Sequence, residues 1–477
     1  MVDLVLVDPP AQLSTRFGKL AKAGSFLPSL GLSFLAAVAR NEGFSVKIVD
    51  ANILGYSFLK LTKEILKENP RWVGISATTL TIEAASKIAA AIKNKSPKVL
   101  VLVGGAHITA TPAETFRRYS EIDIGVIGEG EKTLRELLVV LRKGKNPRKV
   151  KGLIIRESQK LILTGPREFI QNLDELPLPA WDLLPGFPQK YCPSANSFLQ
   201  LPAAHLVTSR GCTGKCLFCD RSVFGRLPRM HSSKRVLEMI EHLVKNYKVK
   251  EIQFFDDNFS LNPKRLEEIC QGLIKKKWGI SWSCQARADM LNPKILRLMK
   301  QAGCWQIGLG IESGSDKILK ILQKGETKKK IKKAVEATSK VGIEVKGFFI
   351  LGNPGETKKT LEETQDFILS LPLTYVHTTF FTPFPGSQAH QVADKFGKFK
   401  FRNDWSKLGQ GTIKPVFVPF GLTKRYLKEK ASEIFKRFYF RPKIIYYHLK
   451  KAIFLPHLWP ALLKGLFSVV AFARKEK

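Results

Sequence analysis

The sequence SRGCTGKCLFCDRS, residues 209–222, places three of the chain's seven cysteines within eight positions. The three are Cys212, Cys216 and Cys219. A structural zinc site normally has four protein ligands, and a disulfide joins two cysteines. Three thiolates this close therefore indicate a soft-metal centre that leaves one coordination position for another molecule. A zinc site completed by a distant ligand, such as His231 or Cys284, is the alternative.

The length and composition of the chain indicate a globular protein with more than one domain. Its 477 residues are more than one hydrophobic core usually holds. Of these residues 44% are hydrophobic and 25% are charged, which are ordinary fractions for a globular protein. The odd number of cysteines argues against a secreted disulfide scaffold. The N-terminal MVDLVLVDPP predicts a buried strand and not a signal peptide. We therefore expect a cytoplasmic protein.

The chain carries a large positive charge, because 78 Lys and Arg residues stand against 41 Asp and Glu. Such a charge attracts nucleic acid, anionic lipid or an acidic substrate. The excess is partly local, since residues 422–477 hold 14 Lys and Arg against three Glu. No nucleic-acid recognition motif accompanies the charge, so a specific nucleic-acid partner is not predicted.

Residues 1–156 alternate short runs of Val and Ile with stretches of helical spacing. This pattern predicts an α/β domain with a doubly wound, Rossmann-like parallel sheet, which binds ligands at the carboxyl ends of its strands. The glycine- and hydroxyl-rich candidates there are Ser76, Thr78, Gly104, Gly105, Thr109, Gly128, Glu129 and Gly130. No G-x-G-x-x-G follows the first strand, which argues against a dinucleotide. A plain strand-to-helix turn at Gly104–Gly105 is the alternative for that pair.

The rest of the chain divides into three parts. Residues 157–202 are rich in proline and predict an irregular interdomain linker. Residues 203–390 repeat the strand-helix alternation six times, which predicts a partial (β/α)6 barrel with its chemistry at the carboxyl ends of the strands. The cysteine triplet lies in the loop after the first of these strands. Residues 391–477 form a basic, apolar extension that we expect to be helical.

The C-x-x-x-C-x-x-C spacing after a first barrel strand resembles the signature of the radical S-adenosylmethionine enzymes. The resemblance implies that the three cysteines hold a [4Fe-4S] cluster whose fourth iron has no protein ligand and binds S-adenosylmethionine. In that family one electron from the cluster cleaves the cofactor to a 5′-deoxyadenosyl radical. An external one-electron reductant of the flavodoxin or ferredoxin type is therefore implied as a partner.

Other barrel loops strengthen this resemblance. GFFILGNPGE, residues 347–356, is similar to the family's strand that passes the adenine, and GIESGS and QAR end two strands with a polar residue. The residues implied to contact S-adenosylmethionine are Phe218, Arg287, Glu312, Gly352, Pro354 and Gly355. Asp256 and Asp257 follow the second strand. Each polar residue alone is equally consistent with a capping or turn role.

A doubly wound domain, a proline-rich linker and then such a barrel resembles the cobalamin-binding subclass, over residues 1–390. GGAHIT and GEGE are similar to its loops around the corrin and the nucleotide tail, so the glycine-rich candidates above are implied to bind cobalamin. The chain lacks the D-x-H-x-x-G motif that supplies a cobalt ligand in many cobalamin proteins, and His107 stands in another context. We do not expect His107 to bind cobalt. A domain that has lost cobalamin is the alternative.

Two reactions fit the subclass. One is methylation of an unactivated carbon with methylcobalamin as the donor, which we favour. The other is radical cyclisation, oxidation or rearrangement without net methylation, as in the tetrapyrrole cyclases. A non-catalytic cobalamin sensor is disfavoured by the intact cysteine triplet, and a methylthiotransferase by the absence of any cysteine before Cys192. The catalytic residues are not identified, and the substrate is expected to be a small or lipid-like molecule.

The extension from Leu422 onward predicts an element at an anionic membrane surface. Basic residues are interleaved with Phe, Tyr and Ile, and a long apolar run follows. The run has the length of a spanning helix, but Pro456, Pro460 and Lys464 favour a helix in the interface, with Trp459 and Phe467 among the buried groups. Contact would then be peripheral, on the inner face of the membrane. A basic helical cap on the barrel is the alternative.

Overall fold

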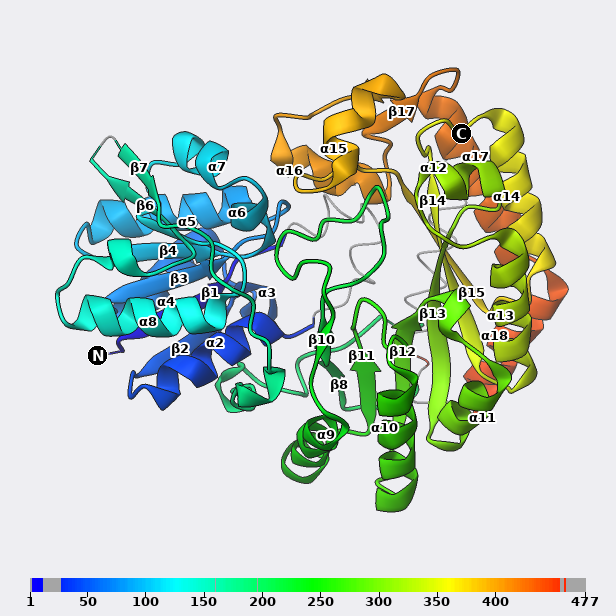
Figure 1. Cartoon of the computed structure of the whole chain (residues 1–477), viewed down its shortest axis with the longest axis horizontal. Helices are drawn as coiled ribbons and strands as arrows, with labels where there is room; N and C mark the ends of the chain where they lie inside the picture. Colours follow the sequence, from blue (N-terminus) through cyan, green and yellow to red (C-terminus); the bar gives the residue numbers. More distant parts are fainter. Residues whose placement is uncertain (1, 12–26, 159, 195, 455–458, 460–477) are drawn as a thin grey trace.

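The computed structural model describes residues 2–11, 27–158, 160–194, 196–454 and 459 (Figure 1). Two sheets lie side by side, one parallel throughout and one parallel except for its last two strands, and a C-terminal region folds back over both of them. The predicted α/β architecture is confirmed: a doubly wound N-terminal domain, a six-stranded partial barrel and a largely helical C-terminus. Pro456, Pro460, Lys464 and Phe467 lie outside the described residues.

The N-terminal sheet has the strand order β2-β1-β3-β4-β5-β6-β7. The strands are β1 (Leu4–Asp8), β2 (Val46–Asp50), β3 (Trp72–Ser76), β4 (Leu100–Gly104), β5 (Ile124–Val126), β6 (Leu153–Glu157) and β7 (Lys160–Leu163). The first five pair in parallel, and the antiparallel β6–β7 hairpin extends the sheet beyond residue 156.

Alternation along the strands buries both faces of this sheet. Leu4 and Leu6 pack in one core with α2 (Leu30–Asn41) and α8 (Gly130–Arg142). Val5 and Val7 pack in another core with α4 (Phe58–Lys67) and α5 (Ile82–Lys95). A sheet covered on both faces needs continuous apolar strands, which explains the runs of Val and Ile in the sequence.

The barrel sheet has the order β15-β14-β13-β12-β11-β8, with every pair parallel. Its strands are β8 (Ala203–Leu206), β11 (Glu251–Phe254), β12 (Ser281–Ala286), β13 (Cys304–Glu312), β14 (Glu344–Leu351) and β15 (Tyr375–Phe380). The helices that cross between them are α9 (Ser233–Tyr247), α10 (Pro263–Lys276), α11 (Pro293–Gln301), α12 (Asp316–Ile321), α13 (Lys328–Lys340) and α14 (Lys358–Ser370).

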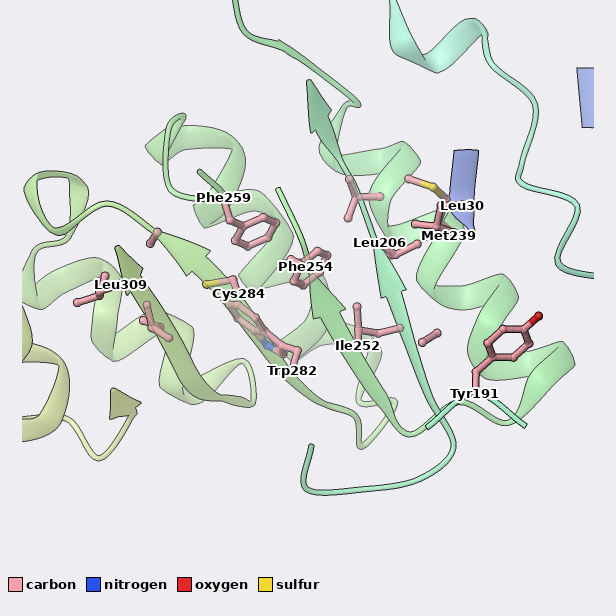
Figure 2. Close-up of a cluster of buried hydrophobic side chains, with 14 of the residues drawn as sticks. Leu30, Tyr191, Leu206, Met239, Ile252, Phe254, Phe259, Trp282, Cys284 and Leu309 are labelled. Atoms are coloured by element: carbon pink, nitrogen blue, oxygen red, sulfur yellow. The ribbon is translucent and has the colours of Figure 1, made fainter. Parts of the chain in front are cut away.

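The two faces of the barrel sheet differ in polarity. Phe254, Trp282 and Leu309 lie on the outer face, in the core under the helices (Figure 2). Their neighbours along the strands, Gln253 and Ser283, lie on the inner face and stand in register with each other. The apolar face of the barrel sheet packs against the helices, and its polar face lines the inside of the barrel. The inside therefore offers polar groups to a ligand.

The proline-rich segment is part of the core and not a loose tether. Tyr191 belongs to the same hydrophobic core as Leu30 of α2 and Met239 of α9, so one core joins both domains (Figure 2). Further along, the backbone N–H groups of Leu199 and Gln200 donate to the Glu251 carboxylate at the start of β11, at 2.8 and 3.0 Å. The segment therefore covers the amino-terminal floor of the barrel.

The C-terminal region contacts both sheets. Its elements are α15 (Gln388–Val392), β16 (Gly397–Phe399), α16 (Trp405–Leu408), β17 (Phe417–Pro419), α17 (Lys424–Tyr439) and α18 (Pro442–Phe454). Trp405 packs in the N-terminal core, whereas Phe417 packs on Leu217 of the cysteine loop. Among the described residues, no helix is both long and apolar enough to span a membrane.

We predict that Trp405→Ala destabilises the protein by about 3–5 kcal/mol, because it leaves a cavity in a packed core. The indole is 1% exposed, and its ring centroid lies 4.2 Å from that of His107. Thermal denaturation followed by circular dichroism measures the loss. Trp278→Ala is the matched control, because this partly buried indole lies at the edge of the barrel core, and the variant should lose less stability. Equal losses of stability in the two variants would contradict the placement of Trp405 in the packed N-terminal core.

Candidate active site

The loops at the carboxyl ends of the two sheets are bonded to each other. Glu129 and Glu131 follow β5 of the N-terminal sheet, and Arg210 follows β8 of the barrel. Both carboxylates pair with the Arg210 guanidinium, at 2.9 and 2.5 Å. Parallel α/β sheets bind ligands at this edge, so the candidate sites of both domains open toward one another.

The backbone of the cysteine loop is held in one shape. Gly211 has a φ of +86°, and a Cβ there would lie 2.6 Å from the carbonyl oxygen of Leu227. The N–H of Leu217 donates to the carbonyl of Leu322 at 2.9 Å. A Cβ on Gly214 would lie 3.4 Å from the sulfur of Cys212 and 3.8 Å from that of Cys216. The loop thus brings two of its three thiols to a residue that has no side chain.

Burial makes two of these thiols poor acids. It raises the pKa of Cys216, against the attraction of Lys324 and Arg287, and it raises the pKa of Cys219 to about 12. Thiolates are the form that binds metal. A cationic centre is therefore needed to hold these sulfurs deprotonated, and metal binding at the loop releases protons.

The zinc alternative does not fit the structure. His231 is buried, stacks on Phe34 and bonds Asp174 through Nδ1 at 3.0 Å. Cys284 lies on the outer face of β12 in the apolar core (Figure 2). Within the part of the chain that the structure describes, no three His, Cys, Asp or Glu side chains could hold one metal ion. Neither of the two named residues is therefore placed to complete a zinc site with the three cysteines.

A chain of alternating charges lies beside the cysteine loop. Arg287 pairs with Asp289 at 2.9 Å and approaches Glu326 at 3.7 Å. Lys324 lies between Glu326 and Glu312, at 3.5 and 3.4 Å. The structure thus brings the expected Arg287 and Glu312 together, and it adds two residues that the sequence reasoning missed. Lys324 and Glu326 follow a short helix and belong to no motif.

Glu312 ends β13 in a strained conformation, with a φ of +68°. Burial raises the pKa of its carboxyl, while Lys324 opposes the shift. A non-glycine residue with positive φ costs free energy, and such strain is enriched at functional sites. The position therefore stays a candidate contact for S-adenosylmethionine.

The GNPGE turn after β14 is internally capped. The Glu356 carboxylate accepts the N–H of Asn353 at 2.9 Å and also the N–H of Gly352. Burial raises the pKa of Glu356 to about 8. Gly352 and Gly355 have φ values of +77° and +74°, which a side chain rarely tolerates. Pro354 is buried in the same turn, and Phe218 packs on the apolar cluster around Leu217 and Phe417.

Asp256 and Asp257 differ in their surroundings. Asp256 is buried and accepts hydrogen bonds from Thr208 and Ser209, which makes it a structural residue at the start of the cysteine loop. Asp257 is exposed at the barrel edge, and burial of its carboxyl, followed by repulsion from Asp256, raises its pKa.

The glycine-rich loops of the N-terminal sheet meet at one place. The hydroxyl of Thr109 accepts the N–H of Gly128 at 3.0 Å and donates to the carbonyl of Gly105 at 2.9 Å. Gly105 has a φ of +123°, and a Cβ there would lie 2.6 Å from the Ala77 carbonyl oxygen. Packing between loops already requires this glycine. Ser76, Thr78, Gly104 and Gly130 lie on the same edge, with Thr78 exposed.

His107 is fully buried under the C-terminal region. Its Nδ1 bonds the hydroxyl of Thr79 at 3.2 Å and its Nε2 that of Thr111 at 3.4 Å. Burial lowers the pKa of His107 to about 3. Both ring nitrogens are engaged and Trp405 covers the ring, which supports the prediction that His107 does not bind cobalt.

Comparison with known proteins identifies the family. Residues 206–368 match the family model of the Radical SAM superfamily, and residues 19–138 match that of the B12 binding domain. The chain is 36% identical over 446 residues to the "Uncharacterized methyltransferase PH0819" of Pyrococcus horikoshii, covering 93% of this chain and 94% of that protein. The chain belongs to the cobalamin-binding radical S-adenosylmethionine enzymes.

Two further proteins are similar to this radical enzyme. It is 27% identical over 437 residues to the anaerobic magnesium-protoporphyrin IX monomethyl ester cyclase of Rubrivivax gelatinosus, covering 90% of this chain and 76% of that protein. Its fold resembles the cobalamin-dependent S-adenosylmethionine radical enzyme OxsB, with a TM-score of 0.76 and 21% identity. That alignment covers 97% of this chain and 72% of the other.

The family has three cofactors, a [4Fe-4S] cluster, S-adenosylmethionine and cobalamin. The donor set of this radical enzyme fits the first, because the sulfurs of Cys212 and Cys216 both face Gly214 and Cys219 follows on the same loop. The loops at the carboxyl edge of the N-terminal sheet fit a large ligand, because Thr78 is exposed there and a Cβ at Gly128 would meet no atom within 4 Å.

Sequence reasoning missed the bond between the two motifs of this radical enzyme. The Glu129 carboxylate accepts from Arg210, from Arg229 at 2.8 Å and from the N–H of Ile170 at 2.7 Å. These carboxylate and guanidinium side chains are 3–8% exposed. The carboxylate is fully engaged at the domain interface, so we retain only the backbone of Glu129 as a candidate cobalamin contact. The paired residues belong to the GEGE and SRGC motifs, but only the tertiary structure shows that the carboxylates of one motif bind the guanidinium of the other.

We predict that Cys216→Ala abolishes the cluster and the cleavage of S-adenosylmethionine, because two thiolates do not hold it. Iron content after anaerobic reconstitution and formation of 5′-deoxyadenosine are the measurements. Cys192→Ala, which removes an exposed thiol elsewhere, should keep both. Full iron and full cleavage in Cys216→Ala would show that the ligands lie elsewhere.

We predict that Thr78→Trp lowers the affinity for hydroxocobalamin at least about tenfold, because the indole fills the space at the carboxyl edge where the corrin is expected. Titration followed by visible absorbance measures it. Lys98→Trp places the same side chain at an exposed residue of the opposite, amino-terminal edge and should bind like the original protein. Equal affinities in the two variants would move the cobalamin site away from this edge.

Proposed function

We propose that this enzyme transfers a methyl group from methylcobalamin to an unactivated carbon of its substrate. The observation that carries the proposal is the bonding of the two carboxyl edges through Glu129, Glu131, Arg210 and Arg229. It turns the cysteine loop toward the loops expected to bind cobalamin. A methyl donor and a radical generator then serve the same substrate carbon.

The residues have separate tasks in this proposal. Cys212, Cys216 and Cys219 hold the cluster, which with S-adenosylmethionine supplies the radical that removes a hydrogen atom from the substrate. Arg287, Glu312, Gly352, Pro354, Gly355 and Phe218 hold S-adenosylmethionine. Ser76, Thr78, Gly104, Gly105, Thr109, Gly128, Gly130 and the backbone of Glu129 hold cobalamin.

Methylation is favoured over the alternatives by the likeness to the protein from Pyrococcus horikoshii, whose name is that of a methyltransferase and whose length matches this chain. Radical cyclisation or oxidation is the second candidate, because the protein from Rubrivivax gelatinosus is named a cyclase. A non-catalytic sensor is disfavoured, because the cysteine loop and the capped GNPGE turn are both intact.

The proposal includes the partners. The radical chemistry needs an external one-electron reductant, which we propose to be of the flavodoxin or ferredoxin type. The substrate is a small or lipid-like molecule. The enzyme works in the cytoplasm, in peripheral contact with the anionic inner face of the membrane and without a specific nucleic acid.

We predict that substrate-dependent turnover forms S-adenosylhomocysteine and 5′-deoxyadenosine in equal amounts. One S-adenosylmethionine supplies the methyl group and a second supplies the radical. The test incubates anaerobically reconstituted enzyme, methylcobalamin and deuteromethyl S-adenosylmethionine with cell extracts, and mass spectrometry follows the label. Cyclisation would give 5′-deoxyadenosine without a labelled product. The Cys216→Ala variant should form neither 5′-deoxyadenosine nor a labelled product. Absence of label from every product, with 5′-deoxyadenosine formed, would refute methylation.

A further inference from the structure

Helix α18 turns apolar side chains toward the solvent. Ile445, Leu449 and Ile453 are 42%, 59% and 70% exposed. Their spacing of four residues places them in one row along the helix. Tyr446, which lies next to this row, is 67% exposed. We refer to these four residues as the α18 stripe.

The opposite side of α18 is fixed to the barrel by the buried side chain of Ile444 and by polar contacts with the barrel floor. Lys451 pairs with Glu344 at the start of β14 at 3.0 Å, and it lies 4.6 Å above the ring of Trp305. Tyr447 also donates to Glu344. Surface helices normally bury their apolar side and expose the polar one. These contacts prevent α18 from turning its stripe inward.

Positive charge borders the stripe. Lys443 and Lys450 are exposed on the same helix, and Lys443 has no ion-pair partner among the described residues. From Ile434 to Lys475 the sequence has nine Lys and Arg and no Asp or Glu. The surface is therefore apolar in its middle and cationic at its margins.

Aromatic side chains stand at both ends of α18. Phe440 precedes the helix and is 54% exposed. Trp459 follows it, is 53% exposed and donates its indole N–H to the carbonyl of Ala452 at 2.7 Å. Aromatic rings of this kind favour the boundary between water and lipid.

We propose that the α18 stripe lies in the surface of an anionic lipid bilayer. The inference rests on the proposed membrane contact and gives it a location, because it assigns the lipid-facing side chains within the predicted extension to the four residues of the α18 stripe. An apolar centre with cationic margins complements acyl chains below anionic headgroups. Nucleic acid would match the charge alone, and a symmetric contact between two copies would bring the cations of both together.

The site of this contact sets the orientation of the enzyme. Glu344, Trp305 and Tyr375 lie at the amino-terminal ends of β13–β15, so α18 covers part of the barrel floor. The cysteine loop follows the carboxyl end of β8, at the other end of the barrel. The stripe therefore anchors the enzyme with its cofactor edge turned away from the lipid.

Flotation of the full, reconstituted enzyme tests the proposal. We predict binding to vesicles of equal parts phosphatidylglycerol and phosphatidylcholine, reduced by salt, and weak binding to pure phosphatidylcholine. Leu449→Gln with Ile453→Gln should lower partition to the anionic vesicles at least about tenfold, because it removes two buried aliphatic contacts. Leu59→Gln with Leu163→Gln, at exposed leucines of the N-terminal domain, should bind unchanged.

Three outcomes would overturn the proposal. Flotation of the α18 variant at the original level would place any lipid contact elsewhere. A change from dimer to monomer in the α18 variant, measured by light scattering without vesicles, would assign the stripe to self-association. Equal losses in both double variants would make the effect non-specific. Formation of 5′-deoxyadenosine in solution should persist in the α18 variant, so a failure here is separable from a failure of the proposed function.

Discussion

The buried ion pairs between Glu129, Glu131, Arg210 and Arg229 fix the position of one cofactor edge against the other. Charges removed from water need close partners, and breaking such a pair costs about 3–5 kcal/mol. Arg210 lies two residues before Cys212, and Glu129 lies between two glycines of a candidate cobalamin loop. A shift of either domain would leave buried charges unpaired. The geometry of the site is therefore a consequence of interface electrostatics as much as of either sheet.

The floor of the barrel is held by a second set of buried polar contacts. The Glu251 carboxylate accepts from Leu199, Gln200, Ser281 and the indole of Trp305. On the neighbouring side, Glu344 receives Lys451 of α18. Two segments far apart in sequence, the linker and the C-terminal helix, thus cover one end of the barrel and leave the cofactor edge at the other.

Local patterns in the sequence were sufficient to predict both sheets, since strand alternation and the cysteine spacing depend on near neighbours. The predicted barrel of six units and the position of the cysteine loop follow from such patterns. The pairing of GEGE with SRGC could not be predicted, because no local pattern reports which carboxylate meets which guanidinium across domains. The return of Trp405 to the N-terminal core is of the same kind. Helix α18 has apolar residues on several sides, so only its contact with Glu344 shows which side is exposed.

The shared scaffold does not determine which reaction the radical serves, because relatives named methyltransferase and cyclase align with nearly the whole chain. The inner face of the barrel carries polar residues that belong to no motif. Lys346 is one such residue. It donates to Asn196 and Ser197 at 3.2 and 3.1 Å, and burial lowers its pKa to about 8. Among the described residues no carboxylate pairs with it, so its ammonium group is held toward the floor of the barrel by the two linker residues.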